Sequence, residues 1–242
     1  MNERPRVAVF RPDDGRLAAA TDLLADLGVD PVGDPMLAVE PSGVGPRPDA
    51  DYVVLTSKTG VECAARQGWT PGTATVCAIG AATADALRDH GYAVDLVPEE
   101  FSSDGLVRAL RDRVPGARVE VARSDHGSEV LLNGLLAAGG YVHETVLYEL
   151  VRPAAAGETA ALAARGELDA ALFTSSLTVE HFLAAAAERG VRDAAVAGLN
   201  DAVVGAIGAP TRETARDHGV GVDVVPDAAA FERLARAVVD AL

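Results

Sequence analysis

The feature that most constrains the fold of this chain is a stretch of sequence that occurs twice. Residues 78–98 read AIGAATADALRDHGYAVDLVP and residues 206–226 read AIGAPTRETARDHGVGVDVVP, so that equivalent positions differ by 128. Each copy follows a β-branched run and predicts a helix that ends at Arg-Asp-His-Gly, with a basic residue in the last turn and a glycine after it. An apolar strand and a proline are expected next. Two such strand–loop–helix–strand units indicate a duplicated lobe.

A second, shorter correspondence supports the duplication. TSKTGVE at 56–62 matches TSSLTVE at 174–180, with an offset of 118. Strands alternate with helices along both halves, a pattern typical of parallel sheets that are covered on both faces. The predicted fold class is therefore α/β, with two similar lobes, each a parallel sheet flanked by helices.

The other elements are expected in chain order around these units. Strands or extended segments are predicted at 6–10, 35–40, 52–55, 118–122, 141–150 and 170–173. Helices are predicted near 15–27, 58–66, 103–113, 128–138, 158–165 and 176–189, and from 231 to the end.

The charge balance bears on which partners to expect. The 242 residues carry a formal net charge of −15, and Lys58 is the only lysine. Nucleic-acid binding requires a basic surface, so this composition argues against it. Abundant Asp and Glu with almost no Lys is typical of a halophilic-type acidic surface, on which salt screens the repulsion. No apolar run is long enough to cross a membrane, and the charged start MNERPRVAVF lacks a signal-peptide segment; both predict a cytoplasmic protein.

Motifs for metals and nucleotides are weak in this sequence. The two cysteines, Cys63 and Cys77, lack zinc-site spacing and are expected to be buried thiols. The run 205–208, GAIG, lacks the full glycine pattern of a dinucleotide site. The five histidines show no metal spacing, and His90 and His218 are expected at helix C-termini. We therefore predict no metal and no cofactor.

Polar residues gather where parallel strands are expected to end, which is where such sheets bind ligands. They are hydroxyls, arginines and helix-start glycines: Arg11, Thr56, Ser57, Gly80, Thr83, Ser102, Ser103, Arg123, Ser124, Thr174, Ser175, Ser176, Gly208 and Thr211. This set suits a large polyanion that is held by many modest contacts. The alternative is that each Ser and Thr only caps a helix.

These residues, in their order and spacing, resemble the uroporphyrinogen-III synthase family over nearly the whole chain. The resembling pieces are Arg11-Pro12, Leu55–Ser57, Ala78–Gly80 with Thr83, Ser103–Leu106, Arg123, Val146–Tyr148, Phe173–Ser175, and Ala206–Gly208 with Thr211. The resemblance implies two lobes joined by a two-stranded linker, with the active site in the cleft between them. Lobe one would be 1–33 plus 153–242, lobe two the inserted 41–143, and the linkers 34–40 and 144–152.

The resemblance also implies a reaction. Linear hydroxymethylbilane would be closed to uroporphyrinogen III, with loss of water and inversion of ring D, by a monomer that uses no cofactor. The substrate's eight carboxylates would meet helix N-termini, hydroxyls and arginines.

Tyr148 resembles the family's linker tyrosine, a candidate proton donor to the departing hydroxyl, although it could instead only pack between the lobes. Thr83 and Thr211 match the family's helix-start threonines, and Pro210 before Thr211 suits a first helical turn.

Two other function classes remain open from the residues alone. One is a catalytically inactive bilobal module of the same fold that binds anions or regulates. The absence of a fused DNA-binding segment weighs against a regulator. The other is an unrelated two-lobed sugar or phosphate enzyme, for which no catalytic carboxylate pair is evident in the sequence.

Overall fold

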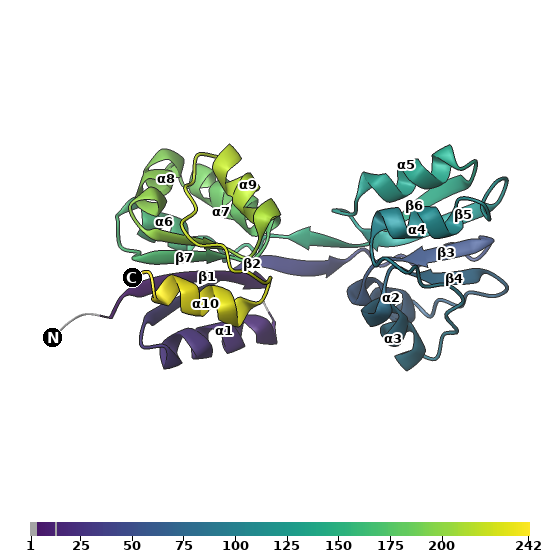
Figure 1. Cartoon of the computed structure of the whole chain (residues 1–242), viewed down its shortest axis with the longest axis horizontal. Helices are drawn as coiled ribbons and strands as arrows, with labels where there is room; N and C mark the ends of the chain where they lie inside the picture. Colours follow the sequence, from purple (N-terminus) through teal and green to yellow (C-terminus); the bar gives the residue numbers. More distant parts are fainter. Residues whose placement is uncertain (1–3, 13) are drawn as a thin grey trace. The chain divides into compact units, whose positions relative to one another are not determined.

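The computed structural model describes residues 4–12 and 14–242, which form two compact units (Figure 1). The terminal unit comprises the chain up to Ala38 together with Val151–Leu242, and the inserted unit comprises Val39–Leu150. The finer division into lobes and linkers stays a prediction, and residues 1–3 and 13 of lobe one lie outside the described residues.

The terminal unit is built on a parallel sheet in the order β2-β1-β7-β8. Its strands are β1 (Arg6–Pro12), β2 (Asp30–Pro41), β7 (Ala170–Phe173) and β8 (Val203–Ala206). One face is covered by α1 (Gly15–Asp26) and α10 (Phe231–Val239). The other face is covered by α6 (Glu158–Ala164), α7 (Ser176–Glu188), α8 (Arg192–Asn200) and α9 (Ala209–Asp217). The N-terminal strand thus lies between β2 and β7, in the middle of the sheet.

The inserted unit is a parallel sheet in the order β4-β3-β5-β6. Its strands are β3 (Tyr52–Leu55), β4 (Thr75–Ala78), β5 (Arg118–Ser124) and β6 (Tyr141–Val151). One face is covered by α2 (Lys58–Arg66) and α3 (Ala81–Asp89), the other by α4 (Ser103–Leu110) and α5 (Glu129–Ala137).

The strand registers make the two units equivalent position by position. In the inserted sheet Leu55 pairs with Ala78 and Ala122, and in the terminal sheet Phe173 pairs with Ala206 and Phe10. The central strand β3 therefore corresponds to β7, β4 to β8, β5 to β1 and β6 to β2. The predicted α/β fold with two similar lobes, each a parallel sheet between helices, is confirmed.

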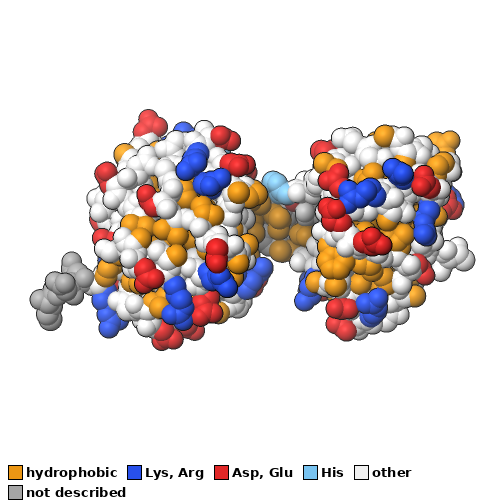
Figure 2. Space-filling model, viewed as in Figure 1, with side chains coloured by type: hydrophobic (Ala, Val, Ile, Leu, Met, Phe, Trp, Pro, Cys, Tyr) orange, Lys and Arg blue, Asp and Glu red, His pale blue; other side chains and the backbone are white. Residues whose placement is uncertain are grey.

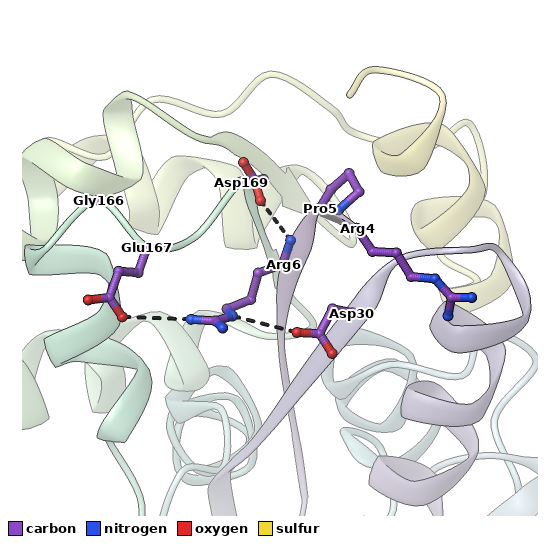
Figure 3. Close-up of a pocket in the computed structure, with 7 residues that line it drawn as sticks. All are labelled: Arg4, Pro5, Arg6, Asp30, Gly166, Glu167 and Asp169. Atoms are coloured by element: carbon purple, nitrogen blue, oxygen red, sulfur yellow. Dashed lines mark hydrogen bonds and ion pairs between the residues drawn. The ribbon is translucent and has the colours of Figure 1, made fainter. Parts of the chain in front are cut away.

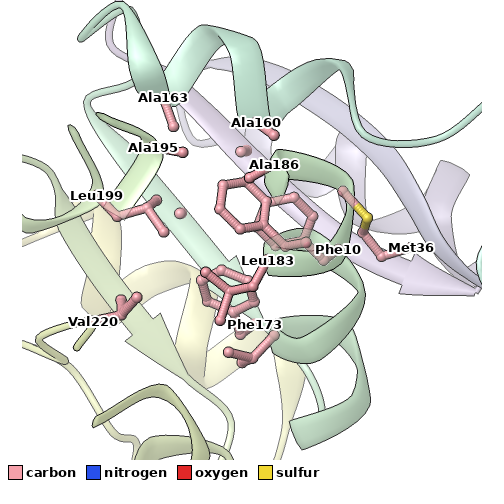
Figure 4. Close-up of a cluster of buried hydrophobic side chains, with 14 of the residues drawn as sticks. Phe10, Met36, Ala160, Ala163, Phe173, Leu183, Ala186, Ala195, Leu199 and Val220 are labelled. Carbon is pink, nitrogen blue, oxygen red and sulfur yellow. The ribbon is translucent and has the colours of Figure 1, made fainter. Parts of the chain in front are cut away.

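Small side chains and a few aromatic rings build the terminal core (Figure 4). The rings of Phe10 and Phe173, from adjacent strands, stack with centroids 4.6 Å apart, and Phe182 of α7 packs at 5.4 and 5.8 Å from them. Helices α6 and α8 approach closely, because a β-carbon on Gly198 would lie 1.8 Å from the carbonyl oxygen of Ala163. In this core, the small residues alanine and glycine let the backbones pack closely, and this close packing fills the space that large side chains fill elsewhere.

The repeated helices end as their sequence predicts. His90 and His218 are the C-cap residues of α3 and α9. Gly91 and Gly219 follow with φ of 81° and 83°, a left-handed conformation that favours glycine. Cys63 and Cys77 are free and buried as predicted, and burial, followed by the charge of Asp95, raises the pKa of Cys77 to about 12.

The strands predicted after the repeated helices do not form. Each is reduced to one isolated bridge, Cys77 with Leu96 and Gly205 with Val224. The reason lies in an aspartate beside each bridge. The Asp95 side chain accepts the backbone N–H of Val76, and the Asp223 side chain accepts that of Val204, both at 2.8 Å. These N–H groups are therefore not available to the backbone carbonyls of an added strand.

Helix α8 was not predicted. It begins after Val191, which offers no side-chain cap, and it contains Gly198, so neither a start signal nor strong helix propensity marks it. Packing against α6 stabilises it instead. None of the described helices combines the length and apolar character that a membrane span requires.

Candidate functional site

Most predicted site residues line two pockets at the carboxyl edges of the sheets, one in each unit. The Tyr148 pocket of the inserted unit has a volume of about 240 Å³ and is lined by Thr56, Ser57, Ile79, Ser103, Arg123, Ser124, His126, Gly127, Ser128, Leu131 and Tyr148. The Arg11 pocket of the terminal unit has a volume of about 230 Å³ and is lined by Arg11, Pro12, Arg16, Leu37, Thr174, Ser175, Ile207, Ala229 and Phe231.

Tyr148 presents its phenol to the start of a helix. The residue is only 6% exposed, and its hydroxyl lies 3.0 Å from Oγ of Ser57. Ser57 is the N-cap of α2, and its Oγ accepts the backbone N–H of Gly60 at 2.9 Å. A phenol hydrogen-bonded at the positive end of a helix can donate a proton or bind an oxygen.

Arg123 is almost fully buried, and its charge is compensated within the protein. Its Nε donates to Glu144 at 2.6 Å, and its terminal nitrogens donate to the backbone carbonyl of Ser128 at 2.5 Å and to Glu129 at 3.2 Å. A β-carbon on Gly127 would lie 2.3 Å from the Arg123 side chain, so this turn is shaped around the guanidinium. Arg123 therefore ties the turn after β5 to the sheet.

The repeated helices begin without side-chain caps. Gly80 and Gly208 are the N-cap residues of α3 and α9, and neither can cap the first-turn N–H groups. In contrast, serines cap α2, α4, α5 and α7. Thr83 and Thr211 are buried, and among the described residues neither hydroxyl has a hydrogen-bond partner. Both helix starts thus keep donors available to a ligand.

Several other candidates are engaged in local hydrogen bonds. Ser102 caps α4 and donates to Glu100, Thr174 donates to the carbonyl of Phe10, Ser175 caps α7, and Ser176 accepts from Thr214. Ser102 and Ser175 thus act as helix caps, Thr174 bonds the neighbouring strand and Ser176 bonds α9, and the substrate roles of these residues stay predictions.

Aromatic residues at the carboxyl edges escaped the sequence analysis. Phe101 is exposed and packs on the start of α3, where a β-carbon on Gly80 would lie 3.0 Å from its ring. In the terminal unit the Arg11 guanidinium lies 4.6 Å from the ring centroid of Phe231. Phe101 directly precedes the cap residue Ser102, and Phe231 is the first residue of α10, so a position at a helix start was the available signal.

The opposite edge of the terminal sheet has a pocket of about 610 Å³, but no predicted site residue lines it (Figure 3). Arg6 is paired there with Asp30 and Glu167, both at 3.6 Å, and its backbone N–H donates to Asp169. This edge carries the amino ends of strands, where parallel sheets rarely bind ligands. Among the described residues, no group of three or more His, Cys, Asp or Glu side chains could hold a metal ion.

The comparison with protein families shows which family the chain belongs to. Residues 18–236 match the family model described as uroporphyrinogen-III synthase HemD. This chain belongs to the uroporphyrinogen-III synthase family. The resemblance recognised in the sequence is thereby confirmed, and with it the assignment to an enzyme family of cyclising hydro-lyases in porphyrin biosynthesis.

Relatives of the uroporphyrinogen-III synthase family agree with this assignment. A putative uroporphyrinogen-III synthase of Methanothermobacter thermautotrophicus is 31% identical over 88% of this chain and 90% of its own length. The uroporphyrinogen-III synthase of Synechococcus elongatus is 30% identical over 55% of this chain and 54% of its own length.

Solved structures of the same family share the fold. A mutant uroporphyrinogen III synthase of Thermus thermophilus superposes with a TM-score of 0.66 at 22% identity, covering 96% of each chain. The Helicobacter pylori enzyme gives 0.65 at 14% identity, covering 99% of this chain and 100% of its own. At this identity the likeness shows the architecture alone.

Proposed function

We propose that this chain closes hydroxymethylbilane to uroporphyrinogen III, and that Tyr148 is the proton donor to the departing hydroxyl. The observation that supports this role is the 3.0 Å contact between the Tyr148 hydroxyl and Ser57 Oγ, in a pocket at the carboxyl edge of the inserted sheet. A buried phenol with a hydrogen-bond partner is positioned, and a positioned acid is what the first step needs.

The proposed steps need little protein chemistry beyond that proton. The pyrrole nitrogen's electrons expel the hydroxyl, which takes the proton of Tyr148 and leaves as water, so that an azafulvene remains. The α-carbon of ring D that already carries the methylene bridge to ring C attacks the azafulvene carbon and forms a spiro intermediate. The bond from this carbon to the bridge then breaks, and the bridge carbon bonds to the free α-carbon of ring D, which inverts the ring. The proton that this last carbon loses balances the one that Tyr148 donated. Geometry decides between this product and the unassisted type I isomer.

Local donors would bind the substrate's carboxylates. The uncapped starts of α3 and α9 offer N–H groups beside Thr83 and Thr211 in both units. The net charge of −15 does not oppose such binding, because salt screens distant charges while short contacts persist. On the face visible in Figure 2, acidic and basic side chains are interspersed on both units, which keeps the local field mixed.

The remaining features complete the proposal. The enzyme would act as a cytoplasmic monomer without cofactor or nucleic-acid partner, with the acidic surface of a protein adapted to high salt. Lobe one would be 1–33 plus 153–242 and lobe two 41–143, connected by the linkers 34–40 and 144–152.

The test supplies freshly generated hydroxymethylbilane to the purified chain and separates the type I and type III products. We expect type III uroporphyrinogen well above the spontaneous background. Type I product alone, at the spontaneous rate, would contradict the proposed function and favour an inactive anion-binding module.

A further inference from the structure

The equivalence of the two sheets relates strand residues of the Tyr148 pocket to strand residues of the Arg11 pocket. Register places Ala122 beside Thr145 and Phe10 beside Asp34, so the next residues, Arg123 and Arg11, occupy the same position in their units. Both strands then shift register, after which Ser124 pairs with Tyr148 and Pro12 with Leu37. Leu37 therefore stands where the inserted unit has its phenol.

The two equivalent arginines differ in what surrounds their charge. Val121 pairs with Glu144, the main partner of Arg123, whereas the equivalent Val9 pairs with Gly33. Gly33 offers no carboxylate. Among the described residues Arg11 has no hydrogen-bond partner, and its Nε is buried without one.

The remaining surroundings of Arg11 hold it in place without neutralising it. Its guanidinium lies 4.6 Å from the ring centroid of Phe231, close enough for a cation–π contact. The nearby Asp14 is bound to Arg16, at 2.6 Å from a terminal nitrogen. Burial and the charge of Arg16 lower the pKa of Arg11 from its ordinary value, against the opposing effect of Asp14. Arg11 remains a cation at neutral pH, and no anion in the described part of the chain is bonded to it.

We propose that the Arg11 pocket is a carboxylate subsite, in which Arg11, supported by Phe231, holds one carboxylate arm of the tetrapyrrole. Thr174 and Ser175 line the same pocket, and its volume of about 230 Å³ accommodates a short carboxyalkyl group. The inference rests on the proposed function and adds a division of labour to it: the terminal unit anchors charge through Arg11, and the inserted unit carries the acid.

The experiment measures binding of uroporphyrin III, an octacarboxylate, and coproporphyrin III, a tetracarboxylate, to the full chain by porphyrin fluorescence. We expect Arg11→Met to weaken uroporphyrin III binding at least tenfold, since the guanidinium–carboxylate contact is charge-assisted. Steady-state kinetics should show a higher KM with kcat within twofold, the sign of a lost binding contact. Arg11→Lys should fall between, because it keeps the charge and loses the planar stack.

The matched control is Arg233→Met, which removes a cation of the same unit that Asp227 already neutralises at 2.7 Å and that is not part of the pocket lining. We expect less than a twofold change. Equal weakening by both variants would mean general charge attraction and would overturn the subsite, as would an Arg11→Met enzyme that binds within twofold of the parent. If Arg11→Met does not fold, uroporphyrin III binding by Arg11→Lys and Phe231→Leu tests the proposal instead. If both variants bind uroporphyrin III as tightly as the parent chain, the proposal is overturned. The binding results do not depend on formation of type III product, so failure of the proposed function stays distinguishable from failure of the subsite.

Discussion

The terminal and inserted units share strand order, register and even a register shift at the end of the equivalent strands, yet their carboxyl edges carry different chemistry. At one position the inserted unit has Tyr148 and the terminal unit has Leu37; at another, Glu144 is replaced by Gly33. Because of the second difference, Glu144 compensates the charge of Arg123, whereas Arg11 has no carboxylate at the equivalent position. The two units therefore share one backbone architecture, and single side chains at equivalent positions give each unit a different chemistry.

The helix starts show the opposite behaviour. Gly80 and Gly208, with Thr83 and Thr211 three residues later, are the same in both units and lack side-chain caps in both. Where a feature is kept twice, both copies are expected to serve the same purpose, here the binding of anionic groups. The comparison thus separates shared binding elements from the specialised pockets.

The largest effect on the reaction rate is expected when the Tyr148 hydroxyl is removed. Tyr148→Phe keeps the ring and its packing but removes the proton, and we expect a loss of roughly 100-fold or more in single-turnover formation of type III product, the usual scale of general acid catalysis. The rate must be corrected for spontaneous type I closure at the same pH.

Tyr141→Phe is the matched control for that variant. Tyr141 lies on the same strand and is 71% exposed, so losing its hydroxyl should leave the rate unchanged. A Tyr148→Phe enzyme within threefold of the parent would end the acid proposal and leave an enzyme that works by geometry alone.

The second effect concerns stability. Arg123→Met leaves Glu144 and the Ser128 carbonyl without their partner, and removal of one member of a buried ion pair costs about 3 kcal/mol or more. Trp69, the only tryptophan, is buried in the inserted unit, so its fluorescence during urea unfolding reports on that unit.

Arg11→Met should lower the free energy of unfolding of the terminal unit by less than about 1 kcal/mol, since no hydrogen bond of a described residue is lost. Circular dichroism follows that transition. Equal destabilisation by the two variants would remove the distinction between a structural and a ligand-facing arginine.

The third prediction compares how tightly the cores of the two units are packed at one equivalent position. Gly205 and Cys77 occupy equivalent bridge positions, but a β-carbon on Gly205 would lie 2.5 Å from Val238 and 2.9 Å from Leu234. Gly205→Ala should therefore destabilise the terminal unit by about 1–3 kcal/mol through overpacking. Cys77→Ala removes only a sulfur and should cost about 1 kcal/mol, seen in the Trp69 transition. If Gly205→Ala leaves circular dichroism unfolding unchanged, the terminal core is more adaptable than its packing indicates.

Much of the architecture could be predicted because local signals and the global fold agree. The repeat located both glycine-started helices, and Ser57, Ser102 and Ser175 were recognisable caps. Most element ends agree to within three residues for the same reason. Strand β2 is the exception, because it begins at Asp30 and the predicted segment 35–40 misses residues 30–34, which pair with β1. Helix α8 escaped because tertiary packing, which the sequence does not display, stabilises a segment without start signals.

The site was less predictable, because its chemistry depends on partners from distant strands. Arg11 and Arg123 look alike in sequence, each following an apolar strand. Only the register between β5 and β6, and between β1 and β2, shows that one faces Glu144 and the other Gly33. Likewise, the contact of Tyr148 with Ser57 joins residues 91 positions apart.

The smallest expected effect tests the feature that the two units share. Thr83→Val and Thr211→Val preserve shape and remove a hydroxyl that has no hydrogen-bond partner among the described residues, so stability should change little. If the hydroxyls bind substrate, each loss costs about 1 kcal/mol, or roughly fivefold. The units should still respond differently. Thr83 belongs to the unit that carries Tyr148, so its loss should lower kcat; Thr211 belongs to the unit that carries Arg11, so its loss should raise KM. Thr21→Val, whose hydroxyl donates to the Ala18 carbonyl, is the control and should change neither. Identical kinetic changes in the two variants would show that the helix starts act as one binding surface, and the division of labour would then rest on Tyr148 and Arg11 alone.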